Sequence, residues 1–135
     1  MVKRIINRIG AISNDMGNVS VVTLPQNYLL IASVYLKGAS NEFCLFLYNP
    51  TTASSQIGIL SDRKAYTTVI DTTTCLGFTD QHSIKGVSTL YKSSDRMVFW
   101  TDNNNKPKYI NLDNLDVFKD STGNWICDAF NTQRS

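Results

Sequence analysis

Few side chains in this sequence could carry out acid–base or metal chemistry. His82 is the only histidine, which excludes a site with two histidine ligands, and its polar neighbours predict a solvent-exposed loop. Asp113 and Asp116 are close carboxylates, but hydrogen bonds to the local backbone account for such residues in turns. No cysteine lies near a histidine in a known nucleophile pattern, and no glycine-rich loop precedes a helix. We therefore expect no enzymatic activity and no cofactor.

A run of oxygen-bearing side chains from Asp102 to Asn105 could in principle ligate a hard cation. The order of ligands found in an EF-hand and its closing glutamate are missing, however. The same side chains tolerate positive φ angles and bond their own backbone, and the nearby Pro107 removes a donor from any strand ladder. We therefore expect a turn here and no metal site.

This turn must join two strands of a hairpin. Residues 97–101 are apolar, aromatic and β-branched, which is typical of a buried strand, whereas residues 108–112 alternate polar with apolar, which predicts a strand with one wet face. Aromatic side chains of this region could line a ligand groove, although aromatics in alternating strands generally belong to the core. These aromatic residues are Phe99, Trp100, Tyr109 and Trp125.

A similar unit lies roughly fifty residues upstream. Residues 43–48 form an equally apolar run, followed by a polar turn and by residues 56–60. Alternating segments at 30–36 and 86–91 precede the two apolar runs. The spacing of about fifty residues is near the period of a propeller blade, although two similar meanders could also arise by chance in one all-β domain. The sequence predicts an all-β fold of antiparallel sheets, with about two propeller-like meander blades.

Further short elements are expected around these units. Residues 65–70 alternate as a strand should and could supply a fourth strand to the first blade. Other strands are expected at 19–24, 75–78 and 125–130. A single helical turn is expected at 113–118, with Asp113 or Asn114 as its cap.

Composition bounds the class of protein. A length of 135 residues fits one domain, a net charge of +2 is too mild to argue for nucleic acid, and no apolar run is long enough to span a bilayer. Cys44, Cys75 and Cys127 are odd in number and widely spaced, so we expect them to be reduced, with two or three of them buried, in a protein kept inside a cell. The predicted organisation is a basic arm at 1–18, a propeller-like domain at 19–130 with repeats at about 28–60 and 84–112, and a polar tail at 131–135.

The basic arm carries the candidate contacts with a partner or with DNA. Three isoleucines recur there at near-helical spacing, which fits a short amphipathic helix or an extended arm that docks on a neighbour. A solvated basic face is the simpler interpretation, and contact with phosphate is the functional one. The basic residues are Lys3, Arg4 and Arg8.

Two blades cannot close a propeller, which typically needs four to eight, and an open pair would leave apolar strand edges and faces exposed. Either the fold is a small closed barrel or sandwich, or other polypeptide completes it. The end of the sequence a few residues after Phe130 favours completion by other polypeptide.

One signature resembles known families. The segment from 97 to 113 resembles the YWTD repeat of β-propellers in lipoprotein-receptor-type ectodomains. The closer resemblance, over residues 29–112, is to the N-terminal regions of tail nozzle or muzzle proteins of podovirus-type and crAss-like phages, which are many times longer. Besides residues 46–49 and 67–70, it rests on a hydrophobic-WTDNxNxPxxIN motif. Its residues here are Phe99, Trp100, Thr101, Asp102, Asn103, Asn105, Pro107, Ile110 and Asn111.

The resemblance implies a structural virion protein at the distal end of a short phage tail, forming part of the DNA-ejection conduit. It implies a homo-oligomeric ring, partners among the ring or adaptor proteins and the remaining muzzle polypeptide, electrostatic contact with exiting DNA, and assembly in the host cytoplasm. Two alternatives stay open. One is a carbohydrate- or receptor-binding module that exposes Trp100 or Trp125 in a groove, and the other is a stand-alone β-barrel that binds a ligand.

Overall fold

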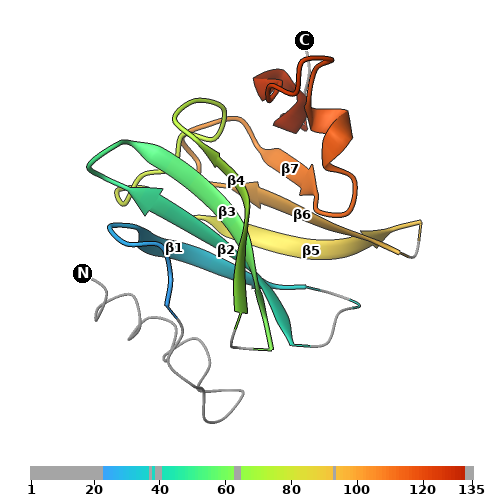
Figure 1. Ribbon diagram of the computed structural model, residues 1–135, viewed down its shortest axis with the longest axis horizontal. Helices are drawn as coiled ribbons and strands as arrows, with labels where there is room; N and C mark the ends of the chain where they lie inside the picture. Colours follow the sequence, from blue (N-terminus) through green and yellow to red (C-terminus); the bar gives the residue numbers. More distant parts are fainter. Residues whose placement is uncertain (1–22, 37, 39–40, 63–64, 93, 133–135) are drawn as a thin grey trace.

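The protein is an all-β structure of two antiparallel sheets (Figure 1). The computed structural model describes residues 23–36, 38, 41–62, 65–92 and 94–132. The predicted basic arm, with Lys3, Arg4 and Arg8, lies outside these residues, as do residues 19–22 and most of the polar tail. None of the helices in the described part of the chain is long and apolar enough to cross a membrane.

The first sheet is a four-stranded meander in the order β1-β2-β3-β4. Its strands are β1 (Leu29–Tyr35), β2 (Glu42–Asn49), β3 (Ser54–Ser61) and β4 (Ala65–Thr72). Each connection between these strands contains a described non-glycine residue at positive φ, namely Asn41, Ala53 or Asp62. The predicted strands of the first unit and the predicted fourth strand are confirmed.

The second sheet contains β5 (Lys85–Tyr91), β6 (Asp95–Thr101) and β7 (Lys108–Asn111), again in chain order. Two 3-10 helices follow, η2 (Leu115–Phe118) and η3 (Cys127–Phe130). The helical turn expected at 113–118 is thus present with Asn114 as the N-cap, but the Asn114 side chain makes no capping hydrogen bond.

Two short strands expected from apolar composition are absent. The segment 75–78 instead turns sharply, since Cys75 and Gly77 both have positive φ. The segment 125–130 makes only an isolated bridge at Trp125 and then winds into η3. Local apolar runs also form turns when their side chains fill a core, and Leu76, Phe78 and Phe130 are all buried. Thr23 and Leu24, the described end of a third expected strand, are not in a strand.

The main core lies between the two sheets. Phe46 of β2 packs edge-on against Trp100 of β6, with ring centroids 5.2 Å apart, and Phe78 from the linker between the sheets contacts both rings. The first strands of the two sheets, β1 and β5, lie side by side (Figure 1). Gly86 permits this approach, because a Cβ atom there would lie 2.9 Å from Val34 Cγ2. Propeller blades stack in this way, with their first strands nearest each other.

The first sheet is buried on its other face as well. A second cluster contains Leu45 and Leu47 of β2, which are 1% and 0% exposed. The remaining buried members of this cluster are Leu24, Leu30, Phe43 and Leu60. Burial on both faces explains why β2 is apolar along almost its whole length.

The prediction that β7 has one solvent-exposed polar face is wrong. Lys108 and Asn111 are each only 7% exposed. The C-terminal segment folds back along β7, where Asn131 forms an antiparallel bridge with Lys108 and its Oδ1 accepts a hydrogen bond from Lys108 Nζ at 2.6 Å. The alternation of polar and apolar residues within 108–112 could not reveal that a segment about twenty positions later buries this strand.

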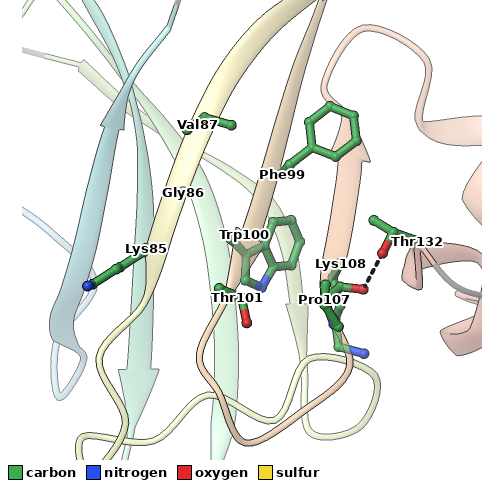
Figure 2. A pocket seen from close by; sticks show the side chains of 9 residues that line it. All are labelled: Lys85, Gly86, Val87, Phe99, Trp100, Thr101, Pro107, Lys108 and Thr132. Atoms are coloured by element: carbon green, nitrogen blue, oxygen red, sulfur yellow. Dashed lines mark hydrogen bonds between the residues drawn. The ribbon is translucent and has the colours of Figure 1, made fainter.

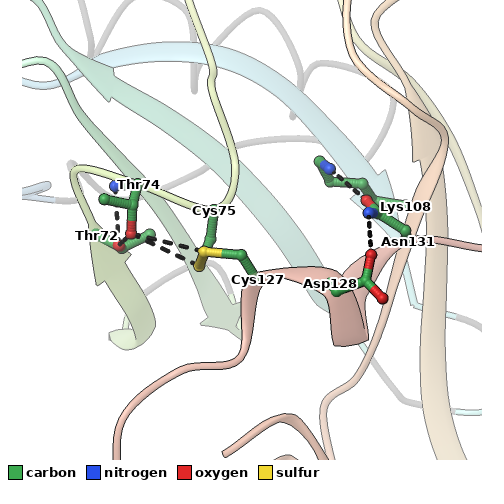
Figure 3. The surroundings of a disulfide bond; sticks show 7 residues. All are labelled: Thr72, Thr74, Cys75, Lys108, Cys127, Asp128 and Asn131. Atoms are coloured by element: carbon green, nitrogen blue, oxygen red, sulfur yellow. Dashed lines mark hydrogen bonds between the residues drawn. A yellow bond between two sulfur atoms is a disulfide. The ribbon is translucent and has the colours of Figure 1, made fainter. Parts of the chain in front are cut away.

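The cysteine prediction is also corrected. Cys75 and Cys127 form a disulfide that ties the segment after β4 to η3 (Figure 3). Only Cys44 is a free thiol, and of the three residues only Cys44 is buried. Sequence spacing failed here because the two partners are 52 positions apart and meet only after the C-terminal segment has folded back.

Replacing both Cys75 and Cys127 by serine should destabilise the fold by about 2–4 kcal/mol, because the unfolded chain regains the entropy that the cross-link removes. Denaturant unfolding without reductant measures this free energy. Addition of reductant should lower the stability of the wild-type chain and leave that of the double variant unchanged. An equally stable double variant would contradict the assignment of a structural disulfide.

Candidate functional site

Four residues of the hydrophobic-WTDN motif, Phe99, Trp100, Thr101 and Pro107, line one hollow on the second sheet, and the other motif residues lie outside it. Trp100 and Ile110 are buried in the core between the sheets. Phe99 alternates with Trp100 along β6 and therefore lies on the opposite face, where it is partly exposed. Asn111 donates from Nδ2 to Asp95 Oδ2 at 3.0 Å. The motif thus specifies a strand, a turn and a returning strand.

The turn of the motif is built around Asp102, which is 6% exposed. Asp102 Oδ1 accepts hydrogen bonds from the backbone N–H groups of Asn104 and Asn105, at 2.9 and 2.8 Å. Asn103 takes the positive φ that the turn requires. Although burial opposes ionisation, these hydrogen bonds hold the pKa of the Asp102 carboxyl below its usual range. The predicted turn is confirmed, and its carboxylate is occupied by the backbone of the turn.

The same turn is tied to the linker between the sheets, because Asn105 Nδ2 donates to Gly77 O at 3.2 Å and to Asp102 Oδ2 at 2.9 Å. Pro107 stands at the end of the turn, and its carbonyl oxygen accepts from the backbone N–H of Thr132 at 3.0 Å. Within the described ranges, no three histidine, cysteine or acidic residues are grouped so that they could hold a metal ion.

The outward face of the second sheet exposes apolar side chains. Cross-strand pairing aligns Val87, Phe99 and Tyr109 on neighbouring strands. Val87 is 65% exposed, and the Phe99 and Tyr109 rings stack with centroids 5.6 Å apart. We call this surface, formed by the outward side chains of β5, β6 and β7, the open face.

Two hollows lie on the second sheet. The first has a volume of about 420 Å³, and Figure 2 shows its lining residues on β5, β6 and β7 together with Pro107 and Thr132. The second, of about 550 Å³, lies beside η2, where Tyr91 and Val117 are 49% and 57% exposed. The lining of the first hollow consists of Lys85, Gly86, Val87, Phe99, Trp100, Thr101, Pro107, Lys108 and Thr132. Exposed apolar surface of this kind marks a contact with another macromolecule more often than a catalytic cleft.

A charged cluster joins the two sheets at one edge. Arg96 at the start of β6 donates from Nη1 to Glu42 Oε1 of β2 at 2.7 Å and from Nη2 to Asp113 Oδ1 at 2.8 Å. The Arg96 backbone N–H also donates to Asp113 Oδ2, at 2.7 Å. The side-chain hydrogen bonds from Arg96 hold the pKa of the Asp113 carboxyl below its usual range, against a smaller opposing effect of burial. The cluster therefore fixes both the sheet stacking and the start of the C-terminal segment.

Sequence reasoning missed this cluster, and it anticipated an exposed apolar face without locating it on the second sheet. A signal for the open face was present, because Val87, Phe99 and Tyr109 are apolar at alternating positions of three predicted strands. No local signal marked Arg96, since Glu42 lies 54 positions away along the chain.

The other candidate side chains have structural positions. Trp100 is 4% exposed and belongs to the core, as expected for an aromatic residue in a strand. Trp125 is partly buried and packs near Phe130, with Lys119 Nζ 4.6 Å from its ring centroid. His82 lies in a loop as predicted, but it is half-buried, and its Nδ1 is hydrogen-bonded to the Thr79 hydroxyl at 2.9 Å.

Comparisons with known proteins give no relative: no family model matches the chain, and neither a curated protein nor a solved structure matches it significantly. The fold defines an all-β protein of two stacked meander sheets. Because no relative is found, its function must be argued from the surfaces of those sheets.

Replacing Arg96 by methionine should lower the free energy of unfolding by about 1.5–3 kcal/mol, because it removes charge-assisted hydrogen bonds from two partly buried carboxylates. Denaturant unfolding at neutral pH checks this value. The matched control is Lys85→Met, which removes the same charge from an exposed site on the second sheet and should change stability by no more than about 0.5 kcal/mol. Equal effects of the two substitutions would contradict the inter-sheet role of Arg96.

Acidic pH should remove the contribution of the Asp113 carboxylate to the stability of the fold. Because the pKa of Asp113 is lower in the folded than in the unfolded chain, its contribution is fully present above the unfolded pKa of about 4 and is lost as the pH falls through the folded pKa. The melting temperature of Asp113→Asn should therefore lie below that of the wild type at neutral pH and approach it as the pH falls below about 4. Parallel curves across this range would contradict the pairing.

Proposed function

We propose that this chain is a structural virion protein, a component of a short phage tail nozzle that forms part of the DNA-ejection conduit. The observation that carries the proposal is the open face, an apolar sheet surface that stands where a propeller would place its next blade. The hydrophobic-WTDN turn, which resembles that of phage muzzle proteins, supports the same assignment. In this role the chain is one section of a larger β-propeller assembly and catalyses no reaction.

The partners follow from the same proposal. Ring or adaptor proteins and the remaining muzzle polypeptide would surround the chain in a homo-oligomeric ring. Lys3, Arg4 and Arg8 would face either a ring partner or the exiting DNA, and any DNA contact would be electrostatic and independent of sequence. Such contacts would weaken steeply as salt concentration rises.

The disulfide is consistent with the proposed location, in which the protein is assembled in the host cytoplasm and then leaves the cell within a particle. Cytoplasmic thiols are kept reduced, whereas disulfides persist outside the cell. Cys127 is exposed and Cys75 is partly exposed, so this pair can oxidise after the particle is released. The buried Cys44 would stay reduced, since its burial raises the pKa of the thiol well above its usual range.

The two alternatives receive less support. Among the described residues, the sheets β1-β2-β3-β4 and β5-β6-β7 do not form a closed barrel, so the stand-alone barrel receives less support than an open pair of sheets. The carbohydrate-binding alternative places Trp100 or Trp125 exposed in a groove, whereas Trp100 is buried and Trp125 is partly covered.

Antibodies raised against the purified chain should label the distal end of the tail on phage particles encoded by the genome that carries this gene. Electron microscopy with gold-labelled antibody measures the position, and pre-immune serum is the control. Particles that contain no copies of the chain by mass spectrometry, or that carry it only on the capsid, would overturn the proposal.

A further inference from the structure

The second strands of the two sheets, β2 and β6, follow the same plan at a fixed offset. Phe46 of β2 is paired across the sheet with Ala32 and Ile57, and Phe99 of β6 is paired with Val87 and Tyr109. The offset between the two phenylalanines is 53 positions (99 − 46). The same offset relates Cys44 to Met97 and Glu42 to Asp95.

In the first sheet these positions are covered by the second sheet. The Phe46 ring lies against Trp100, and Glu42 Oε1 accepts from Arg96 Nη1 at 2.7 Å. Cys44 and Phe46 are both 0% exposed. One aromatic ring and one guanidinium group of the following sheet thus define the contact.

In the second sheet the equivalent positions face the two hollows. Phe99 lines the first hollow and is partly exposed, and Met97 lines the second but is only 9% exposed. Asp95 accepts from Asn111 Nδ2 at 3.0 Å and from the Ser94 hydroxyl at 3.3 Å. Among the described residues no cation pairs with Asp95, whereas Glu42 has Arg96.

We infer that the open face binds a third antiparallel sheet, whose second strand brings an arginine to Asp95 and an aromatic ring to Phe99. This inference rests on the proposed role as one section of a larger propeller, and it names the chemistry of the partner. The partner is polypeptide outside the 135 residues of this sequence, built on the same blade pattern as the second sheet.

A second copy of the chain does not fit this surface. The face that it would have to present is the outer face of its own first sheet, where Leu45 and Leu47 are already buried. That face also has Phe43 at the position of Arg96, by the same offset of 53 (96 − 43). It therefore offers no cation to Asp95.

The C-terminal segment reaches the place from which a further sheet can follow. In the first sheet, Asp71 of β4 pairs with Gln56 just before the chain crosses to the second sheet. In the second sheet, Asn131 forms an antiparallel bridge with Lys108, which is the position equivalent to Gln56 because Leu47 pairs with Gln56 and Trp100 with Lys108. A blade joined after Thr132 would thus repeat the existing crossing.

A tandem protein tests the inference. A second copy of residues 73–132, which contains its own disulfide pair, is joined after Thr132 so that the added Arg96 and Trp100 can reach Asp95 and Phe99. Val87→Cys in the original unit reports cover of the open face by its rate of reaction with a maleimide at low protein concentration, without reductant. Thr67→Cys, on exposed strand β4, is the matched control.

We expect Val87→Cys to react at least about tenfold more slowly in the tandem protein than in the single chain, with Thr67→Cys unchanged, because docked surface reacts only through local opening. Asp95→Asn should lower the melting temperature of the tandem protein and have little effect on that of the single chain. An unchanged rate for Val87→Cys would overturn the proposal, whether the added copy is unfolded or folded elsewhere, because that copy carries every required contact.

Other results would overturn parts of the proposal. If Val87→Cys is protected in the tandem protein but Asp95→Asn does not lower its melting temperature, the proposed contact between Asp95 and an arginine is wrong. If Val87→Cys is already protected in the single chain, and that chain is a dimer stable to dilution, a second copy covers the open face. If this protection is lost when residues 1–22 are deleted, the chain's own arm covers the open face. Labelling of phage tails is independent of these measurements, so the tandem can fail while the tail assignment stands.

Discussion

The packing of Phe46 against Trp100 is the contact on which the arrangement of the two sheets depends. Phe78 completes the aromatic group from the linker, so one cluster joins β2, β6 and the crossing between the sheets. Arg96 then fixes the edge by pairing with Glu42 across the interface. Because apolar packing is non-directional whereas a guanidinium–carboxylate pair is directional, the rings supply most of the burial and Arg96 sets the register.

This stacking makes the two sheets unequal. The first sheet has apolar clusters on both faces, whereas the second is covered on one face and leaves Val87 and Phe99 accessible on the other. The C-terminal segment compensates in part, since the Cys75–Cys127 disulfide and the Asn131 bridge hold it along β7. It does not extend over β5, where Val87 lies. The second sheet, which keeps an uncovered apolar face at β5 and β6, is therefore suited to stack on another sheet.

Local chemistry allowed the strands and the Asp102 turn to be predicted. Alternating apolar residues need no distant information to form a strand, and Asp102 bonds the backbone of its own turn. Features that join distant residues could not be predicted in this way. Cys75 and Cys127 meet only through the folded-back C-terminal segment, and Lys108 is buried only because Asn131 covers it. Phe99 and Trp100 are adjacent and equally aromatic, so their opposite environments follow from the alternation of β6 combined with the stacking of the sheets.

The central claim is that the open face is a surface for assembly, and light scattering after size-exclusion chromatography, over a range of concentrations, tests it most directly. The comparison is between the wild-type chain and Val87→Lys, with Thr67→Lys as the matched control on β4. The account predicts that the uncovered open face causes reversible aggregation with no fixed stoichiometry, not a dimer, so that the apparent mass of the wild type and of Thr67→Lys rises with concentration. Val87→Lys should stay monomeric, because a charge on the open face opposes apolar contact. A wild-type chain that stays monomeric at every concentration and unfolds in one cooperative transition would contradict the account.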